Sequence, residues 1–104
     1  MVPVAIDIAH LKQQTFDDPD LQREILQIFQ QQAPMLLAAL SANTGIARSE
    51  IAHRIKGSAL AIGANTLADA ADKLETSPDD PALMRAVELS MDTTLKAIVE
   101  LLSH

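Results

Sequence analysis

The stretch IARSEIAHRIKGSALAI, residues 46–62, decides the fold because its apolar residues recur at helical spacing. A helix turns about 100° per residue, so this spacing gathers them on one face, which we expect to pack into a core. The expected core positions are Ala47, Ile51, Ile55, Ser58 and Ile62, with Ala59 at the edge. This segment therefore predicts one amphipathic helix with a buried face and an exposed face.

The exposed face of this predicted helix combines a histidine with small and apolar residues. Gly57 lies one turn after His53, and glycine inside a helix costs about 1 kcal/mol relative to alanine. Such a glycine leaves space for another molecule beside the imidazole. Leu60 and Ala64 continue the face with apolar surface, which is typical of a docking patch. The full exposed face is expected to comprise Ser49, His53, Lys56, Gly57, Leu60 and Ala64.

Cap and turn residues divide the rest of the chain into further helices. Asp18-Pro19 and Asp80-Pro81 each place an N-cap aspartate before a proline at the first helical position. Gly63 suits the left-handed conformation that ends many helices, and Asn65 is expected to cap the helix after it. The expected helices are a short opening segment from about Val4 to Gln13, Pro19 to about Ala42, 46–62, a short one from Asn65 through Leu74, and a long one after Pro81.

These elements predict an all-α fold, an antiparallel up-down four-helix bundle with the short extra N-terminal helix laid across one end. The chain of 104 residues is long enough for one core, and we expect a single domain over residues 1–104. Pro34 falls inside the second expected helix, where proline removes one backbone hydrogen bond. We therefore expect either a kink at Pro34 or two abutting helices.

Composition excludes several classes of function. The chain has no cysteine, which rules out disulfides, thiolate metal sites and a thiol nucleophile. Its net charge of −6, from 14 acidic and 8 basic residues, argues against a protein that binds nucleic acid by neutralising phosphates. No apolar stretch approaches the length of a transmembrane helix, and the N-terminus lacks the features of a signal peptide. We therefore expect a cytoplasmic protein that binds neither nucleic acid nor membrane.

Among the three histidines, only His53 has neighbours that suggest chemistry, whereas His10 and His104 are assigned to ordinary surface or core positions. The basic residues near His53, which predict a locally positive patch, are Arg48, Arg54 and Lys56. The chain has no glycine-rich phosphate loop and no metal-ligand spacing, and no further group that activates the imidazole is evident. We expect no metal site, no cofactor bound by this chain and no autonomous kinase activity.

The stretch HRIKGSALAIGA, residues 53–64, followed by Leu67 and then by Leu74-Glu75, closely resembles the signature of histidine-containing phosphotransfer (HPt) domains. In that family the histidine helix reads His-x-Leu-Lys-Gly-Ser-Ala, with Gly-Ala shortly after, and Ile55 stands here where leucine is usual. Phe29 in the preceding helix also fits the family's spacing. The resemblance covers essentially the whole chain and implies a four-helix bundle that relays phosphoryl groups.

The resemblance implies a role for each residue of the exposed face. His53 would accept a phosphoryl group from the aspartate of a receiver domain and pass it to another receiver, as a phosphotransfer intermediate. Lys56 would help to hold the phosphoryl oxygens, and Gly57 would leave room for them. The residues expected to dock the receiver are Ser49, Arg54, Gly57, Leu60 and Ala64.

The implied partners are receiver domains of a hybrid histidine kinase and of response regulators in a two-component phosphorelay. The receiver would supply the aspartate and a Mg²⁺ ion, and this chain, expected to be a monomer, would supply the nucleophile. That division suits phosphoryl transfer, which requires mainly in-line positioning and charge neutralisation from the protein.

Three alternatives stay open from the sequence. A non-catalytic helical interaction module would bind a receiver domain without being phosphorylated, although His53 together with Lys56 and Gly57 argues against it. The phosphoacceptor domain of a sensor kinase would also display a histidine on a helix. There we would expect an acidic residue directly after the histidine, where this chain has Arg54. A phosphoacceptor fragment cut from a larger histidine kinase also stays open.

Overall fold

The helices expected from the sequence are present in the computed structural model, which describes residues 5–103. They are α1 (Ile8–Gln14), α2 (Pro19–Ala42), α3 (Gly45–Ile62), α4 (Asn65–Thr76) and α5 (Pro81–Leu102). Residues 5–103 contain no β-strand, so the all-α prediction is confirmed. The predicted start of the opening segment at Val4 and the assignment of His104 lie outside the described residues.

Two helices begin with the aspartate and proline signal predicted for them. The Asp18 carboxylate accepts hydrogen bonds from the backbone N–H groups of Asp20 and Leu21, and Pro19 occupies the first turn of α2. Asp80 repeats this arrangement at the start of α5. α2 runs without interruption through Pro34, so of the two outcomes expected there, a kink or two abutting helices, the second is wrong.

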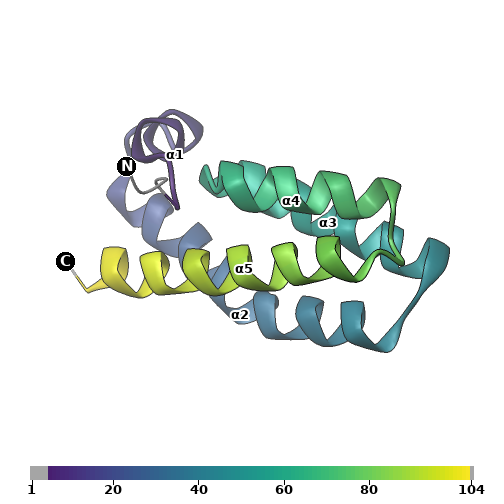
Figure 1. The fold of residues 1–104 in the computed structure, drawn as a ribbon. Coiled ribbons are helices and arrows are strands. Elements are labelled where there is room, and N and C mark those ends of the chain that lie inside the picture. Colours follow the sequence, from purple (N-terminus) through teal and green to yellow (C-terminus); the bar gives the residue numbers. More distant parts are fainter. Residues whose placement is uncertain (1–4, 104) are drawn as a thin grey trace.

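Helix α3 ends at a glycine that the fold requires for two reasons. Gly63 has φ 78°, the left-handed region in which an L side chain is strained. A Cβ atom at this position would lie 2.7 Å from the carbonyl oxygen of Asp7, and the Asp7 N–H donates to the Gly63 carbonyl at 2.8 Å. The segment before α1 therefore packs directly against the end of α3, and Figure 1 shows α1 at that end of the molecule.

The core lies between helices α2 to α5, with α3 in contact with both α2 and α4, and α5 in contact with α4 and α2 (Figure 1). The apolar residues of α4 lie on its buried face. On α3 the buried face is rotated from the predicted one, because Ala47 is exposed and Ala52 is fully buried. The buried residues of α3 and α4 are Ala52, Ile55, Ala59, Ile62, Leu67, Ala68, Ala70, Ala71 and Leu74.

The start of α3 is held by side chains that reach across two loops. Arg48 donates from Nε to the carbonyl oxygens of Leu40 at 3.0 Å and Asn43 at 2.8 Å, and from Nη1 to that of Pro78 at 3.1 Å. The Asp79 carboxylate accepts the first N–H group of the helix at 2.9 Å. Arg48 is therefore structural and does not contribute to a positive patch at His53.

None of the helices within residues 5–103 combines the length and apolarity needed to cross a membrane.

Candidate functional site

His53 lies in the middle of α3 with its imidazole largely in solvent and one ring nitrogen bound to α4. The side chain is 67% exposed, and Nδ1 lies 3.1 Å from each carboxylate oxygen of Glu75. An ionised carboxylate only accepts hydrogen bonds, so Nδ1 carries the hydrogen. In the neutral imidazole the lone pair therefore sits on Nε2, the nitrogen that has no protein partner among residues 5–103.

A second contact between side chains connects the same two helices one helical turn away. Lys56 follows His53 by three positions on α3, as Glu75 follows Asp72 on α4, so each pair lies on one helix face. The Lys56 ammonium donates to Oδ1 of Asp72 at 2.8 Å. Two basic groups on α3 thus face two carboxylates on α4 in adjacent turns.

The Lys56 and Asp72 charges shift each other's protonation. The hydrogen bond from Lys56, together with its positive charge, lowers the pKa of the Asp72 carboxyl below its ordinary value. The same hydrogen bond and the charge of Asp72 raise the pKa of Lys56, and the charge of Glu75 raises it further, while partial desolvation opposes the increase. Both groups therefore stay charged across the neutral pH range.

Gly57 and Leu60 lie on the exposed face, as predicted. A Cβ atom built on Gly57 meets no atom within 4 Å, so packing inside this chain does not require a glycine there. Leu60 is 44% exposed, although its carbonyl oxygen accepts a 2.8 Å hydrogen bond from Nε2 of His10. His10 is thus a satisfied structural histidine, in agreement with its assignment from the sequence.

Ser49 and Arg54 flank His53 in different ways. The Ser49 hydroxyl donates to the carbonyl oxygen of Glu75 at 2.6 Å, so it anchors the end of α4 beside the imidazole. Arg54 is exposed and has no hydrogen bond or ion pair with any residue from 5 to 103. A shallow hollow beside the imidazole is lined by Ile46, Ser49, Glu50, His53, Arg54 and Glu75.

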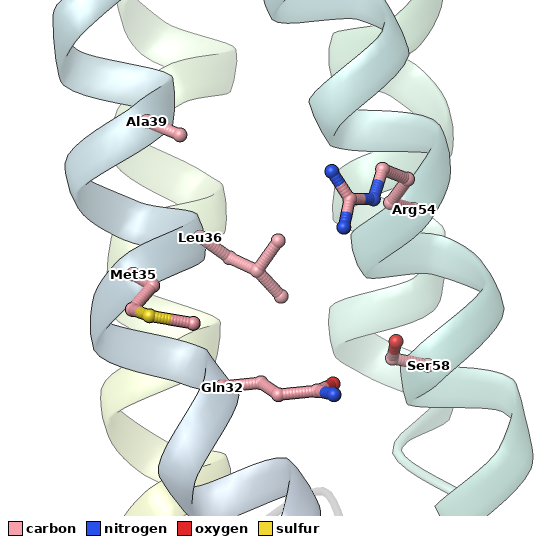
Figure 2. A pocket seen from close by; sticks show the side chains of 6 residues that line it. All are labelled: Gln32, Met35, Leu36, Ala39, Arg54 and Ser58. Carbon is pink, nitrogen blue, oxygen red and sulfur yellow. The ribbon is translucent and has the colours of Figure 1, made fainter.

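Arg54 also faces a groove between α2 and α3, with a volume of about 220 Å³. Figure 2 shows its guanidinium directed into the space between the two helices, together with the side chains of Leu36 and Gln32. Met35 on the α2 wall is 69% exposed. The groove therefore combines an unpaired cation with accessible apolar surface.

The expectation that Ala64 belongs to the exposed face is wrong, because Ala64 is fully buried. The helix ends at Ile62, and Gly63 then turns the chain in the left-handed conformation. The Ala64 N–H bonds back to the carbonyl of Ala59 at 2.9 Å, which directs its methyl group into the core. A helical projection no longer applies beyond the last helical residue.

Sequence reasoning missed the two carboxylates of the site, Asp72 and Glu75. Glu75 appears in the sequence only as part of the Leu74-Glu75 signature, which was its one signal, and Asp72 lies on the polar face of α4 with no signal of its own. No group of three or more histidine, aspartate or glutamate side chains within residues 5–103 is arranged to hold a metal ion. The site is an exposed imidazole with charged neighbours.

Comparison with protein-family models matches residues 24–103 to the Hpt domain. The matched region includes all of α3, α4 and α5 and most of α2, whereas α1 lies outside it. Comparison with curated proteins and with solved structures gives no match. Hpt domains act in phosphotransfer in two-component signalling and interact with receiver domains, and this chain belongs to the Hpt domain family.

Proposed function

We propose that this chain relays a phosphoryl group between the aspartates of receiver domains through Nε2 of His53. The observation that carries the proposal is the imidazole itself, exposed on one side and held through Nδ1 by Glu75 on the other. In the loading step the Nε2 lone pair forms a bond to phosphorus while the bond from phosphorus to the aspartyl oxygen breaks. The aspartate leaves with the electron pair, and onward transfer reverses the step.

Glu75 acts in this proposal as a positioning residue. Formation of the N–P bond leaves positive charge on the ring, and the Glu75 carboxylate lies 3.1 Å from the Nδ1 hydrogen-bond donor that carries part of it. The same bond fixes which nitrogen is free and how the ring is oriented, as the buried aspartate does in hydrolase triads. Lys56, one turn along α3, supplies positive charge for the phosphoryl oxygens.

The proposed docking face surrounds His53 on α3. Gly57 gives close access to the helix, Leu60 supplies apolar contact and Arg54 supplies an unpaired cation, with Ser49 at the edge. The exposed side chains of Ile46 and Met35 extend the apolar part of this face on either side. The partners in this proposal are receiver domains of a hybrid histidine kinase and of response regulators, and the receiver brings the Mg²⁺ ion.

The scaffold of the proposed relay is a single domain in which α2 to α5 form an antiparallel up-down bundle. Two observations support this arrangement. The connections between the helices are short, at residues 43–44, 63–64 and 77–80, and the contacts form a closed ring from α2 through α3, α4 and α5 back to α2. All side chains of the proposed phosphoryl site come from α3 and α4 of one chain, so a monomer suffices. The composition of the chain predicts a cytoplasmic location.

The test is incubation of the purified chain with a phosphorylated receiver domain and Mg²⁺. We expect label that is labile in acid and stable in base, and we expect His53→Gln to abolish it. His10→Gln is the matched control and should retain the label, because His10 bonds to the Leu60 carbonyl away from the phosphoryl site. Label that persists in His53→Gln contradicts the proposal, and receiver binding without any label identifies a non-catalytic interaction module instead.

A further inference from the structure

Asp72 occupies a place in the site that the phosphoryl relay described above does not explain. Its carboxylate receives the Lys56 ammonium at 2.8 Å, and the carboxylate is 54% exposed, so core packing does not require this ion pair. Nearby Asp69 shows the ordinary alternative, because it bonds to Lys73 of its own helix at 3.3 Å. Asp72 instead reaches across to α3, to the one basic side chain that a turn of helix separates from His53.

The Lys56 ammonium is bonded to Asp72 at 2.8 Å and also lies near enough to Glu75 to be affected by its charge. The charge of Glu75, like that of Asp72, raises the pKa of Lys56, and Glu75 is bonded to His53. The ammonium therefore lies within electrostatic range of the imidazole while its hydrogen bond goes to α4. An ion pair between partly exposed groups is weak and exchanges readily with a stronger anion.

We propose that Asp72 is a positioning residue that holds the Lys56 ammonium on the α4 side of His53 and competes for it with a phosphoryl group on His53. This inference rests on the proposed function of His53. A phosphoryl group on Nε2 carries up to two negative charges and three acceptor oxygens, which makes it a stronger partner for an ammonium than one carboxylate. With Asp72 present, Lys56 divides its charge between two anions.

This competition has a direct consequence for the relay. A phosphoryl group that receives only part of the Lys56 charge is held less firmly and is transferred onward more readily. Without Asp72, the ammonium would neutralise the phosphoryl group more completely and the phosphohistidine would be more stable. Asp72 thus favours onward transfer of the phosphoryl group over its retention on His53.

The test uses phosphoramidate, which loads an exposed histidine without any receiver. The Nε2 lone pair bonds to phosphorus, the P–N bond of phosphoramidate breaks, and ammonia leaves with the electron pair. ³¹P NMR then gives the pH at which the phosphohistidine at position 53 titrates, with the signal assigned by its absence in His53→Gln. In Asp72→Asn we expect this pH to fall by about 0.5 unit, because the freed ammonium favours the more negative form of the phosphohistidine.

Three further variants separate the proposed route from a general charge effect. Asp69→Asn removes the same charge from the same helix and should shift the phosphoryl titration by less than half as much. In a Lys56→Met background, Asp72→Asn should also shift it by less than half as much, since only direct repulsion remains. Lys56→Met alone should raise the titration pH, which provides a readout that does not depend on folding of the Asp72 variant.

The proposal is overturned if Asp72→Asn leaves the phosphoryl titration unchanged, or if the Lys56→Met background retains half of the shift or more. Lys56→Met without an effect overturns it as well. These results are distinct from a failure of the relay, which shows as missing label from a phosphorylated receiver while chemical loading by phosphoramidate still succeeds.

Discussion

The two ends of α3 and its middle make different kinds of contact, although they belong to one helix. At the ends, Arg48 and Gly63 bond to backbone groups of neighbouring segments. In the middle, the side chains of His53 and Lys56 bond to side chains of α4, and Arg54 has no partner within residues 5–103. Backbone contacts are fixed by the fold, whereas side-chain contacts can exchange for a ligand. We therefore expect substitutions at the ends to change stability and those in the middle to change transfer.

The largest expected effect is that of Gly63→Ala at the end of α3. The new Cβ would meet the Asp7 carbonyl oxygen at 2.7 Å in a backbone with φ 78°. We expect the free energy of unfolding to fall by about 3 kcal/mol, from the left-handed conformation and the overlap together. Urea denaturation followed by circular dichroism measures this change.

Gly45→Ala is the matched control for Gly63→Ala. Gly45 also has a positive φ, 57°, but a Cβ there meets no atom within 4 Å. We expect a loss of only about 1 kcal/mol, from the backbone conformation alone. Equal decreases in the free energy of unfolding of the two variants would show that the close approach of Asp7 to Gly63 does not affect stability.

Arg48→Ala is expected to have the next largest effect on stability. The part-buried guanidinium satisfies three carbonyl oxygens, one at the end of α2 and one in each of two loops, and its removal should cost about 2 kcal/mol. Arg54→Ala, on the same helix, should change the free energy of unfolding by less than about 0.5 kcal/mol, yet slow phosphoryl transfer from a receiver. If Arg48→Ala slowed transfer without a loss of stability, and Arg54→Ala lowered stability without slowing transfer, the proposed difference between the ends and the middle of α3 would be contradicted.

The same division explains which features were predictable from the sequence. Local signals predicted the caps at Asp18 and Asp80 and the end of α3 at Gly63, because each depends on one or two residues. The exposure of His53 and Gly57 followed from helical periodicity, which assigns a face without knowledge of the neighbouring helices.

What the sequence did not reveal depends on how segments meet. The burial of Ala64 depends on the turn at Gly63, and alanines such as Ala47 and Ala52 carry too little hydrophobicity to fix which of them faces the core. The pairing of Glu75 and Asp72 with α3 depends on the register between two helices, and the two-residue connection at 63–64 sets that register. Periodicity within one helix contains no information about register.

Glu75→Ala tests the middle of the helix at the imidazole. It removes the hydrogen-bond acceptor of Nδ1 and leaves the backbone contact between Ser49 and residue 75 intact. We expect loading of His53 by a phosphorylated receiver to slow about tenfold, which corresponds to one charge-assisted hydrogen bond. Rapid-quench measurement of the label gives the rate, and stability should change little.

Glu75→Gln is the control for charge against hydrogen bonding, because the amide oxygen accepts the same bond from Nδ1. We expect a rate between those of the original chain and Glu75→Ala. A rate for Glu75→Ala equal to that of the original chain would show that His53 needs no partner on α4.

Gly57→Ala is expected to change stability and transfer in opposite directions. A Cβ at this exposed helical position meets no atom within 4 Å, so alanine should raise the free energy of unfolding by about 1 kcal/mol.

Phosphoryl transfer should nevertheless be slower in Gly57→Ala, and slower still in Gly57→Leu, because the added atoms occupy space that a docked receiver needs. Thr93→Leu, at another exposed helical site on α5, should leave the transfer rate unchanged. Unaltered transfer in Gly57→Leu would remove the glycine from the docking face. A more stable but slower Gly57→Ala protein would show that the middle of α3 gives up stability so that a partner can approach His53.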